Sequence, residues 1–312
     1  MKVIYGINAV KRYKNAVVAL GVFDGVHRAH RRILKFAART ARRIGGVSIV
    51  ITFYPHPQKK QSLYSLEHRL RLISELGIDA CMVIKFNQRF AKTPACDFIK
   101  NILVKKIGAR YICVGRNFRF GQNAQGDIAF LRKYSRIYNF KLKVFDLIRI
   151  NRYPVSSTYI RKLITEGFLS TAEKLLGRRL SLFGTVIKGS SLAKNLGFPT
   201  ANIDPHHEVL PPSGVYAVYV FLGKKKFGAL CYIGKPARQW FGFPHSQSQK
   251  QVEAHILNFR KNIYGADLEV QFIKKIRDKK RFSSRASLIK QIKKDAHSTR
   301  QILQGRLTHH NI

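Results

Sequence analysis

Acidic residues are scarce in this sequence of 312 residues. It contains 16 Asp and Glu against 58 Lys and Arg, so its formal net charge at pH 7 is +42. The cations are spread along the whole chain, including amphipathic stretches such as 133–143 and 274–285, and their distribution in the sequence does not define one binding surface. Such diffuse charge attracts any polyanion. We expect it to help recruit small anionic ligands, and specific nucleic-acid binding is the less favoured alternative.

Cysteine and long apolar runs are also scarce. The four cysteines contain no C-x-x-C pair, which argues against a structural zinc site or a disulfide framework: Cys81, Cys96, Cys113 and Cys231. No apolar run approaches the roughly 20 residues of a membrane-spanning helix. The first residues, MKVIYGINAVKRY, lack the continuous apolar region of a secretion signal. We therefore expect a cytoplasmic protein without membrane association.

Strand-like and helix-like patterns alternate in the first half of the chain. Apolar, β-rich runs predict strands at 17–20, 47–53, 81–86, 111–114 and 142–148. Helical spacing predicts helices at 66–76, 96–106 and 126–138. This alternation is typical of a parallel sheet, in which ligands bind at the carboxyl ends of the strands.

The pattern changes after Gly177. Two short helices are expected before it, at 159–165 and 171–176, and a last helix at 287–303. Between them, short β segments alternate with turns, at 182–188, 214–222, 226–233, 251–257 and 267–276. This pattern is typical of an antiparallel barrel or sandwich. We predict an α/β domain over 1–176 and a β domain over 177–312.

The most informative segment is 15–34, in which a strand, a glycine corner and two histidines follow one another. The corner at 21–25 reads Gly-Val-Phe-Asp-Gly, and His27 and His30 follow it at the start of a helical pattern. Histidines at positions i and i+3 share one face of a helix. Free backbone N–H groups at a helix N-terminus already favour phosphate. The segment therefore indicates a nucleotide-phosphate site, although an ordinary turn with two surface histidines is the alternative.

Four segments of the first half resemble motifs of bacterial FAD synthetases. Residues 21–30 follow G-x-F-D-G-x-H-x-G-H except at Ala29. Residues 52–57 follow T-F-x-P-H-P, 115–121 follow G-x-[DN]-F-x-F-G, and 156–161 follow S-S-T-x-[IV]-R. The resemblance implies a Rossmann-like nucleotidyltransferase domain. Such a domain transfers the adenylyl group of ATP to FMN, giving FAD and pyrophosphate.

The resemblance also implies roles for individual residues. His27 and His30 would donate hydrogen bonds to phosphate oxygens during catalysis. Four corner residues would bind the nucleotide: Gly21, Phe23, Asp24 and Gly25. Four residues at a second helix start would hold the leaving pyrophosphate: Ser156, Ser157, Thr158 and Arg161. Asn117 and Arg119 would contact either the flavin phosphate or ATP.

Motifs of the second half resemble those of riboflavin kinases. Residues 196–202 read L-G-F-P-T-A-N, and 253–259 match E-x-H-[IL]-x-x-F. The resemblance implies an antiparallel barrel with a terminal helix, which phosphorylates riboflavin to FMN with ATP and Mg²⁺. Glu253 would be the base, and Thr200 and Asn202 would bind Mg²⁺ and ATP oxygens. The other expected nucleotide-binding residues are Gly189, Lys194, Pro199 and Arg277.

Nearly all of the chain, from about residue 16 to residue 303, is thus similar to bacterial bifunctional riboflavin kinase/FAD synthetases, with departures. Ala29 replaces the glycine between the histidines, Ala193 and Lys194 replace a glycine and an arginine, and the segment 232–250 is atypical. One alternative is a riboflavin kinase whose adenylylation is weakened by Ala29. Others are a nucleic-acid-associated basic protein on this scaffold and a non-catalytic relative. The intact kinase positions argue against the last. The sequence leaves the oligomeric state open.

Overall fold

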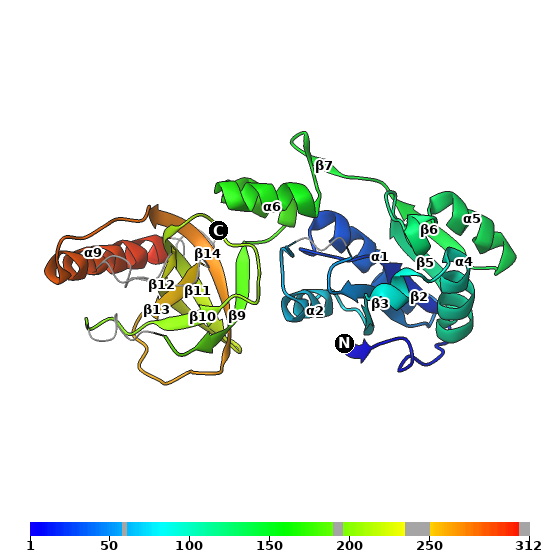
Figure 1. The fold of residues 1–312 in the computed structure, drawn as a ribbon, viewed down its shortest axis with the longest axis horizontal. Coiled ribbons are helices and arrows are strands. Elements are labelled where there is room, and N and C mark those ends of the chain that lie inside the picture. Colours follow the sequence, from blue (N-terminus) through cyan, green and yellow to red (C-terminus); the bar gives the residue numbers. More distant parts are fainter. Residues whose placement is uncertain (58–60, 190–195, 235–249, 306–312) are drawn as a thin grey trace. The chain divides into compact units, whose positions relative to one another are not determined.

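The computed structural model describes residues 1–57, 61–189, 196–234 and 250–305. Contacts divide the chain into two units (Figure 1). The first unit comprises Met1–Ile160 and Leu175–Gly177, and the second comprises Arg161–Lys174 and Arg178–Ile312. Because the segment before Gly177 contributes to both units, the domain boundary at 176/177 stays a prediction.

The first unit is built on a six-stranded parallel sheet with the order β1-β4-β3-β2-β5-β6. Its strands are β1 (Lys2–Tyr5), β2 (Ala16–Leu20), β3 (Ser48–Tyr54), β4 (Ala80–Lys85), β5 (Ala109–Gly115) and β6 (Lys141–Phe145). The five strands expected from the sequence are confirmed, and β1 is additional. Every residue of β2 is buried, as expected for a central parallel strand covered on both faces.

Helical segments connect these strands. They are α1 (Arg28–Arg43), α2 (Leu66–Ser74), α3 (Gln88–Ala91), α4 (Ala95–Asp97), the π-helix η1 (Phe98–Ile107), the 3₁₀-helix η2 (Gln122–Ala124) and α5 (Ile128–Ile137). The helix expected at 96–106 is present, but it runs mostly as a π-helix. It ends at Gly108, whose φ of +77° is left-handed.

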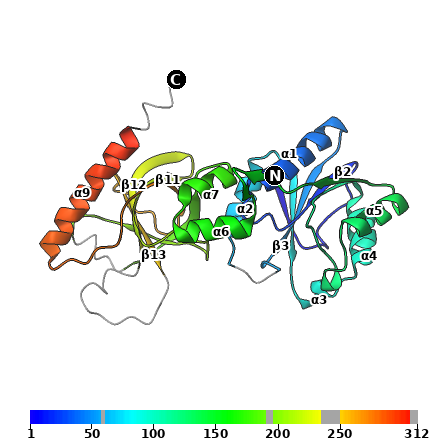
Figure 2. The same ribbon diagram turned by 90° about the horizontal axis from the view of Figure 1, so that it is seen from above.

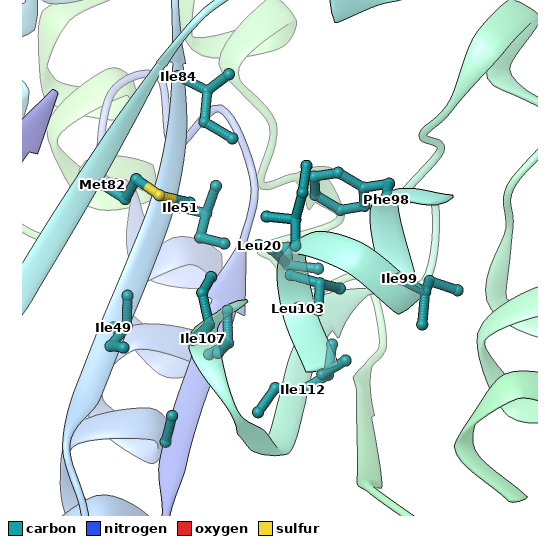
Figure 3. Packing of buried hydrophobic residues seen from close by; sticks show 14 of the residues in the cluster. Leu20, Ile49, Ile51, Met82, Ile84, Phe98, Ile99, Leu103, Ile107 and Ile112 are labelled. Atoms are coloured by element: carbon teal, nitrogen blue, oxygen red, sulfur yellow. The ribbon is translucent and has the colours of Figure 1, made fainter. Parts of the chain in front are cut away.

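The core of the first unit lies where η1 packs on the sheet (Figure 3). Leu20 and Ile51 from the strands belong to the same buried cluster as Phe98, Leu103 and Ile107 from η1. Alternate residues of a strand point to opposite faces. The remaining residues of the central strands therefore face the other side of the sheet, and α1 contacts β2, β3 and β5.

A small hairpin of β7 (Arg149–Ile150) and β8 (Tyr153–Pro154) precedes two helices, α6 (Ser157–Glu166) and α7 (Leu169–Leu176). The second unit is built on a closed antiparallel barrel with the order β10-β13-β12-β11-β14-β9. Its strands are β9 (Ser181–Ile187), β10 (Ala201–Asp204), β11 (Gly214–Leu222), β12 (Lys225–Gly234), β13 (Gln251–Ile256) and β14 (Asp267–Arg277). Pairing of β9 with β10 closes the barrel, so the sandwich alternative is wrong.

The terminal helix α9 (Arg285–Gln304) packs against the barrel strands β11, β12 and β14 (Figure 2). Ser284 and Ser287 form a capping box at its start. Its Asp295 is buried and accepts hydrogen bonds from Nε and Nη2 of Arg277 on β14, at 2.9 and 2.7 Å to Oδ2. Gln291 donates a third bond to the same carboxylate. This ion pair ties α9 to the barrel.

We predict that Asp295→Ala lowers the free energy of unfolding by about 3 kcal/mol, because it leaves the largely buried guanidinium of Arg277 without its partner. Urea unfolding followed by far-UV circular dichroism measures the change. The control is Asp278→Ala, which removes an exposed carboxylate paired with Lys275 and should cost less than about 1 kcal/mol. Equal losses in the two variants would contradict the assignment.

Candidate active sites

The corner after β2 has a strained backbone. Phe23, Gly25 and Val26 have φ angles of +52°, +82° and +39°. A Cβ on Gly25 would lie 2.5 Å from Cδ1 of Leu63, so this position requires glycine for space as well as for conformation. Non-glycine residues adopt such angles only where the surrounding structure holds them. The conformation of the corner is therefore maintained by contacts with neighbouring residues, and not by the intrinsic backbone preferences of its own residues.

The two histidines lie together at the start of α1. His27 is the N-cap residue, and its Nδ1 accepts a hydrogen bond from the backbone N–H of His30 at 3.4 Å. The two rings stack with centroids 3.6 Å apart. Because Nδ1 is an acceptor, a neutral His27 carries its proton on Nε2. The N-terminus of α1 thus combines imidazole groups with a positive helix end, which suits phosphate.

The start of α6 is hydrogen-bonded to this corner. The hydroxyl of Ser157 donates to the backbone oxygen of Asp24 at 2.7 Å. The hydroxyl of Ser156 accepts from the backbone N–H of Tyr159 at 3.3 Å and caps the helix. Thr158 is exposed in the same first turn, and Arg161 lies one turn further along α6. The structure thus brings two helix N-termini, both expected to bind phosphate, to the same place.

Asn117 and Arg119 lie in the loop after β5, and both are exposed. Since β5 pairs in parallel with β2, this loop and the histidine corner follow the same edge of the sheet. Arg119 pairs with Asp127, at 3.1 Å from Nη1 to Oδ2. The backbone N–H of Phe130 and the nearby Arg119 hold the pKa of the Asp127 carboxyl below its usual value. Arg119 is therefore oriented by Asp127 in the structure.

The candidate residues of the second unit meet on two paired strands. Asn202 of β10 lies opposite Glu253 of β13 in the barrel register. The side chain of Thr200, just before β10, is hydrogen-bonded to the Glu253 carboxyl. Burial raises the pKa of Glu253, and the bond from Thr200 partly opposes this rise. A carboxylate with a raised pKa is a stronger base for proton transfer.

A pocket of about 250 Å³ opens beside these strands. Its lining includes Gly189, Thr200, Asn202 and the loop 259–264, whereas Glu253 lies outside the lining. A Cβ on Gly189 would lie 2.0 Å from Nδ2 of Asn202, so only a glycine backbone can approach this amide so closely. The pocket thus brings the Gly189 backbone and the loop 259–264 next to the Thr200 hydroxyl and the Asn202 amide.

Three other residues were expected to bind the nucleotide in the second unit: Pro199, Arg277 and Lys194. The ring Nδ1 of His255 donates to the backbone oxygen of Pro199 at 2.8 Å, which orders the loop before β10. The guanidinium of Arg277 is bound to Asp295, so its nucleotide-binding role stays a prediction. Lys194 lies outside the described residues, as do Ala193 and most of the atypical segment 232–250.

Each candidate site also has residues that belong to none of the sequence motifs. Arg260 and Lys261 line the second pocket. In the first unit, the buried Arg69 of α2 donates to the backbone oxygen of Val22, within the corner. The sequence does indicate that Arg69 is buried, because it lies on the apolar face of the helix, three residues after Leu66. A cation on the buried stripe of a helix indicates a buried partner.

Comparisons with known proteins match both units. A family model described as FAD synthetase matches residues 9–159, and one described as riboflavin kinase matches residues 176–303. A bifunctional riboflavin kinase/FMN adenylyltransferase of Buchnera aphidicola (from Schizaphis graminum) is 36% identical over 306 residues, covering 95% of this chain and 96% of that protein. The protein of the same name from Escherichia coli K12 is 33% identical over 312 residues, covering 96% and 97%.

A solved structure also matches nearly the whole chain. It is titled as a macrolide-efflux protein from Streptococcus pneumoniae, and it has a TM-score of 0.80 and 27% identity, covering 96% of this chain and 99% of that one. Among the described residues, no helix has the length and apolar character needed to cross a membrane. On the strength of the two family models and the full-length relatives, the chain belongs to the bifunctional riboflavin kinase/FMN adenylyltransferase family.

Proposed function

We propose that this chain makes FAD from riboflavin in two ATP-dependent steps. The second unit phosphorylates riboflavin to FMN, and the first unit adenylylates FMN with release of pyrophosphate. The observation that carries the proposal is that one chain holds two candidate sites. In one, the capped histidines of α1 adjoin the Ser157 hydroxyl bonded to Asp24, and in the other the Thr200 hydroxyl is bonded to the buried Glu253. Family membership supports the same pair of activities, and it does not favour the nucleic-acid alternative.

Adenylyl transfer needs positioning and charge neutralisation rather than a protein nucleophile. An FMN phosphate oxygen attacks the α-phosphorus of ATP, and the bond to the pyrophosphate oxygen breaks. His27 and His30 donate hydrogen bonds to the phosphate oxygens as charge develops on them. Ser156, Ser157, Thr158 and Arg161 hold the departing pyrophosphate at the α6 N-terminus. Asn117 and Arg119 orient one of the two phosphate groups from the loop after β5.

Phosphorylation of riboflavin requires a base beside the ribityl hydroxyl. Glu253 accepts the proton of that hydroxyl while the hydroxyl oxygen attacks the γ-phosphorus of ATP, and ADP leaves. The neutral oxygen donors of Thr200 and Asn202 face the pocket and suit Mg²⁺, a hard cation that keeps several waters and binds substrate phosphates. When bound there, the metal neutralises phosphate charge. Gly189 admits the phosphates close to the backbone.

The proposal is tested by supplying the two flavins separately. Purified chain with ATP and Mg²⁺ should convert riboflavin to FMN and FAD, and FMN to FAD, as followed by chromatography. Conversion of riboflavin to FMN alone, with no FAD from added FMN, would favour the single-activity alternative. Absence of both products would reject the proposal. Steeply salt-dependent nucleic-acid binding by a catalytically silent protein would favour the nucleic-acid alternative.

We predict that Glu253→Gln lowers FMN formation by about 100-fold or more, because the amide cannot accept the proton of the ribityl hydroxyl. FAD formation from added FMN should be unchanged, since Glu253 lies in the other unit. The two rates are measured on the same preparation, and far-UV circular dichroism checks that the variant is folded. Loss of both activities in a folded variant would contradict independent sites.

His30→Ala should have the reverse effect. Removing one donor that stabilises developing phosphate charge typically costs about 100-fold in rate, and we expect a loss of that order in FAD formation from FMN. Riboflavin phosphorylation should stay at the wild-type rate. Wild-type FAD formation in this variant would show that the stacked histidines do not serve the adenylyl transfer.

Ala29→Gly should change FAD formation less than several-fold. Ala29 lies in the first turn of α1, where the backbone is regularly helical and glycine's conformational freedom is not required. The assay is the initial rate with added FMN at saturating ATP. A gain of several-fold would instead show that the methyl group obstructs ATP, as the single-activity alternative requires.

A further inference from the structure

A fully buried arginine lies beneath the phosphate-directed corner. Arg69 is 2% exposed and shares the buried face of α2 with Leu66, Leu72 and Ile73. Ser65 caps the start of this helix and so fixes which residues face inward. A buried guanidinium persists only where hydrogen bonds and opposite charge compensate its lost hydration. Two of the groups that compensate Arg69 belong to the corner, namely the Val22 carbonyl and the Asp24 carboxylate.

The first of these groups is a backbone carbonyl. Nη1 of Arg69 donates to the oxygen of Val22 at 2.7 Å and to Oγ1 of Thr52 at 3.3 Å. The Thr52 hydroxyl in turn donates to the same Val22 oxygen at 2.8 Å. Two buried donors therefore hold the carbonyl that immediately precedes Phe23, the first residue of the corner with a positive φ.

The second group is the carboxylate of Asp24, which is also buried. Its Oδ1 accepts from the backbone N–H of Leu63 at 2.8 Å and of Tyr64 at 3.4 Å. Burial lowers the pKa of Arg69, and the negative charge of Asp24 acts in the opposite direction. The side chain of Asp24 thus ties the corner to residues 63–64, and its nearby charge makes a cationic Arg69 tolerable.

We propose that Arg69 is a positioning residue for adenylyl transfer, which holds the strained 21–26 corner through the Val22 carbonyl and thereby places His27 and His30. The inference rests on the proposed FMN adenylylation. Arg69 acts through Val22 and does not contact the nucleotide. Without it, the corner relaxes from its positive-φ conformation, and the N-cap that links His27 to His30 loses its geometry.

The test uses the full chain with three substitutions. Arg69→Leu removes the donors and the charge, whereas Arg69→Lys keeps a cation and one donor. Arg71→Leu is the matched control, two residues away on the same helix and not on its fully buried face. For each variant, kcat and KM for ATP and FMN are measured in FAD formation. Far-UV circular dichroism checks that each variant is folded, and the rate of FMN formation from riboflavin checks that the second unit is unaffected.

We expect Arg69→Leu to lower kcat for FAD formation by about tenfold to 100-fold, because small displacements of positioned groups have effects of this size. KM values should change much less, and Arg69→Lys should recover part of the loss. A wild-type kcat in Arg69→Leu would overturn the inference. So would a change confined to KM, or a Lys variant that is as slow as the Leu variant.

A second readout does not depend on activity. In protein with isotope-labelled histidine, the imidazole resonances of His27 and His30 should move in Arg69→Leu and stay in place in Arg71→Leu. Unchanged resonances in Arg69→Leu would overturn the inference even if the rate fell. If the wild-type chain forms no FAD from FMN, the proposed function fails, and the resonances still decide whether Arg69 positions the corner.

Discussion

Burial of both faces of the parallel sheet determines where chemistry can occur in the first unit. Strands β2 and β3 are buried almost throughout, with apolar residues facing η1 on one side. Polar side chains for catalysis therefore have to emerge where the strands end. The loops at 21–27 and 115–121 both do so, and the capped start of α6 is bonded to the first of them.

Closure of the barrel has the same effect in the second unit. The short strand β10 pairs with β9 on one side and with β13 on the other. This pairing places Asn202 opposite Glu253, although fifty residues of sequence separate them. Strand β10 begins directly after Thr200, completes the barrel and brings Asn202 to the pocket.

Regular elements could be predicted from the sequence because their signals are local. The strands at 17–20 and 214–222 are continuous β-rich runs, and their positions are confirmed with errors of a residue or less. Strand β10 was missed because four residues containing Asn and Asp have little strand preference of their own. Its pairing partners, which are distant in sequence, supply the stability that its composition lacks.

The site was predictable to the extent that its residues form contiguous motifs. The histidine corner and the Ser156–Thr158 segment are each readable within ten residues, and the structure joins them through Ser157. The contribution of Arg69 could not be predicted in this way, because it depends on a hydrogen bond to Val22, which is distant in sequence. For Arg277, a motif position predicts a nucleotide ligand, and the structure adds an ion pair with Asp295 that the sequence does not indicate.

Acidic residues are few in this chain, and the partners of each buried carboxylate indicate its role. Asp295 faces the guanidinium of Arg277 and the amide of Gln291, so its charge is compensated and its role is to hold α9. Glu253 has a different environment: a neutral hydroxyl bonds to it, and burial raises its pKa. Burial disfavours the charged form of the Glu253 carboxyl and so strengthens its tendency to take up a proton. The difference in partner, rather than in residue type, distinguishes the Asp295 carboxylate, which holds α9, from the Glu253 carboxylate, for which we propose the role of base.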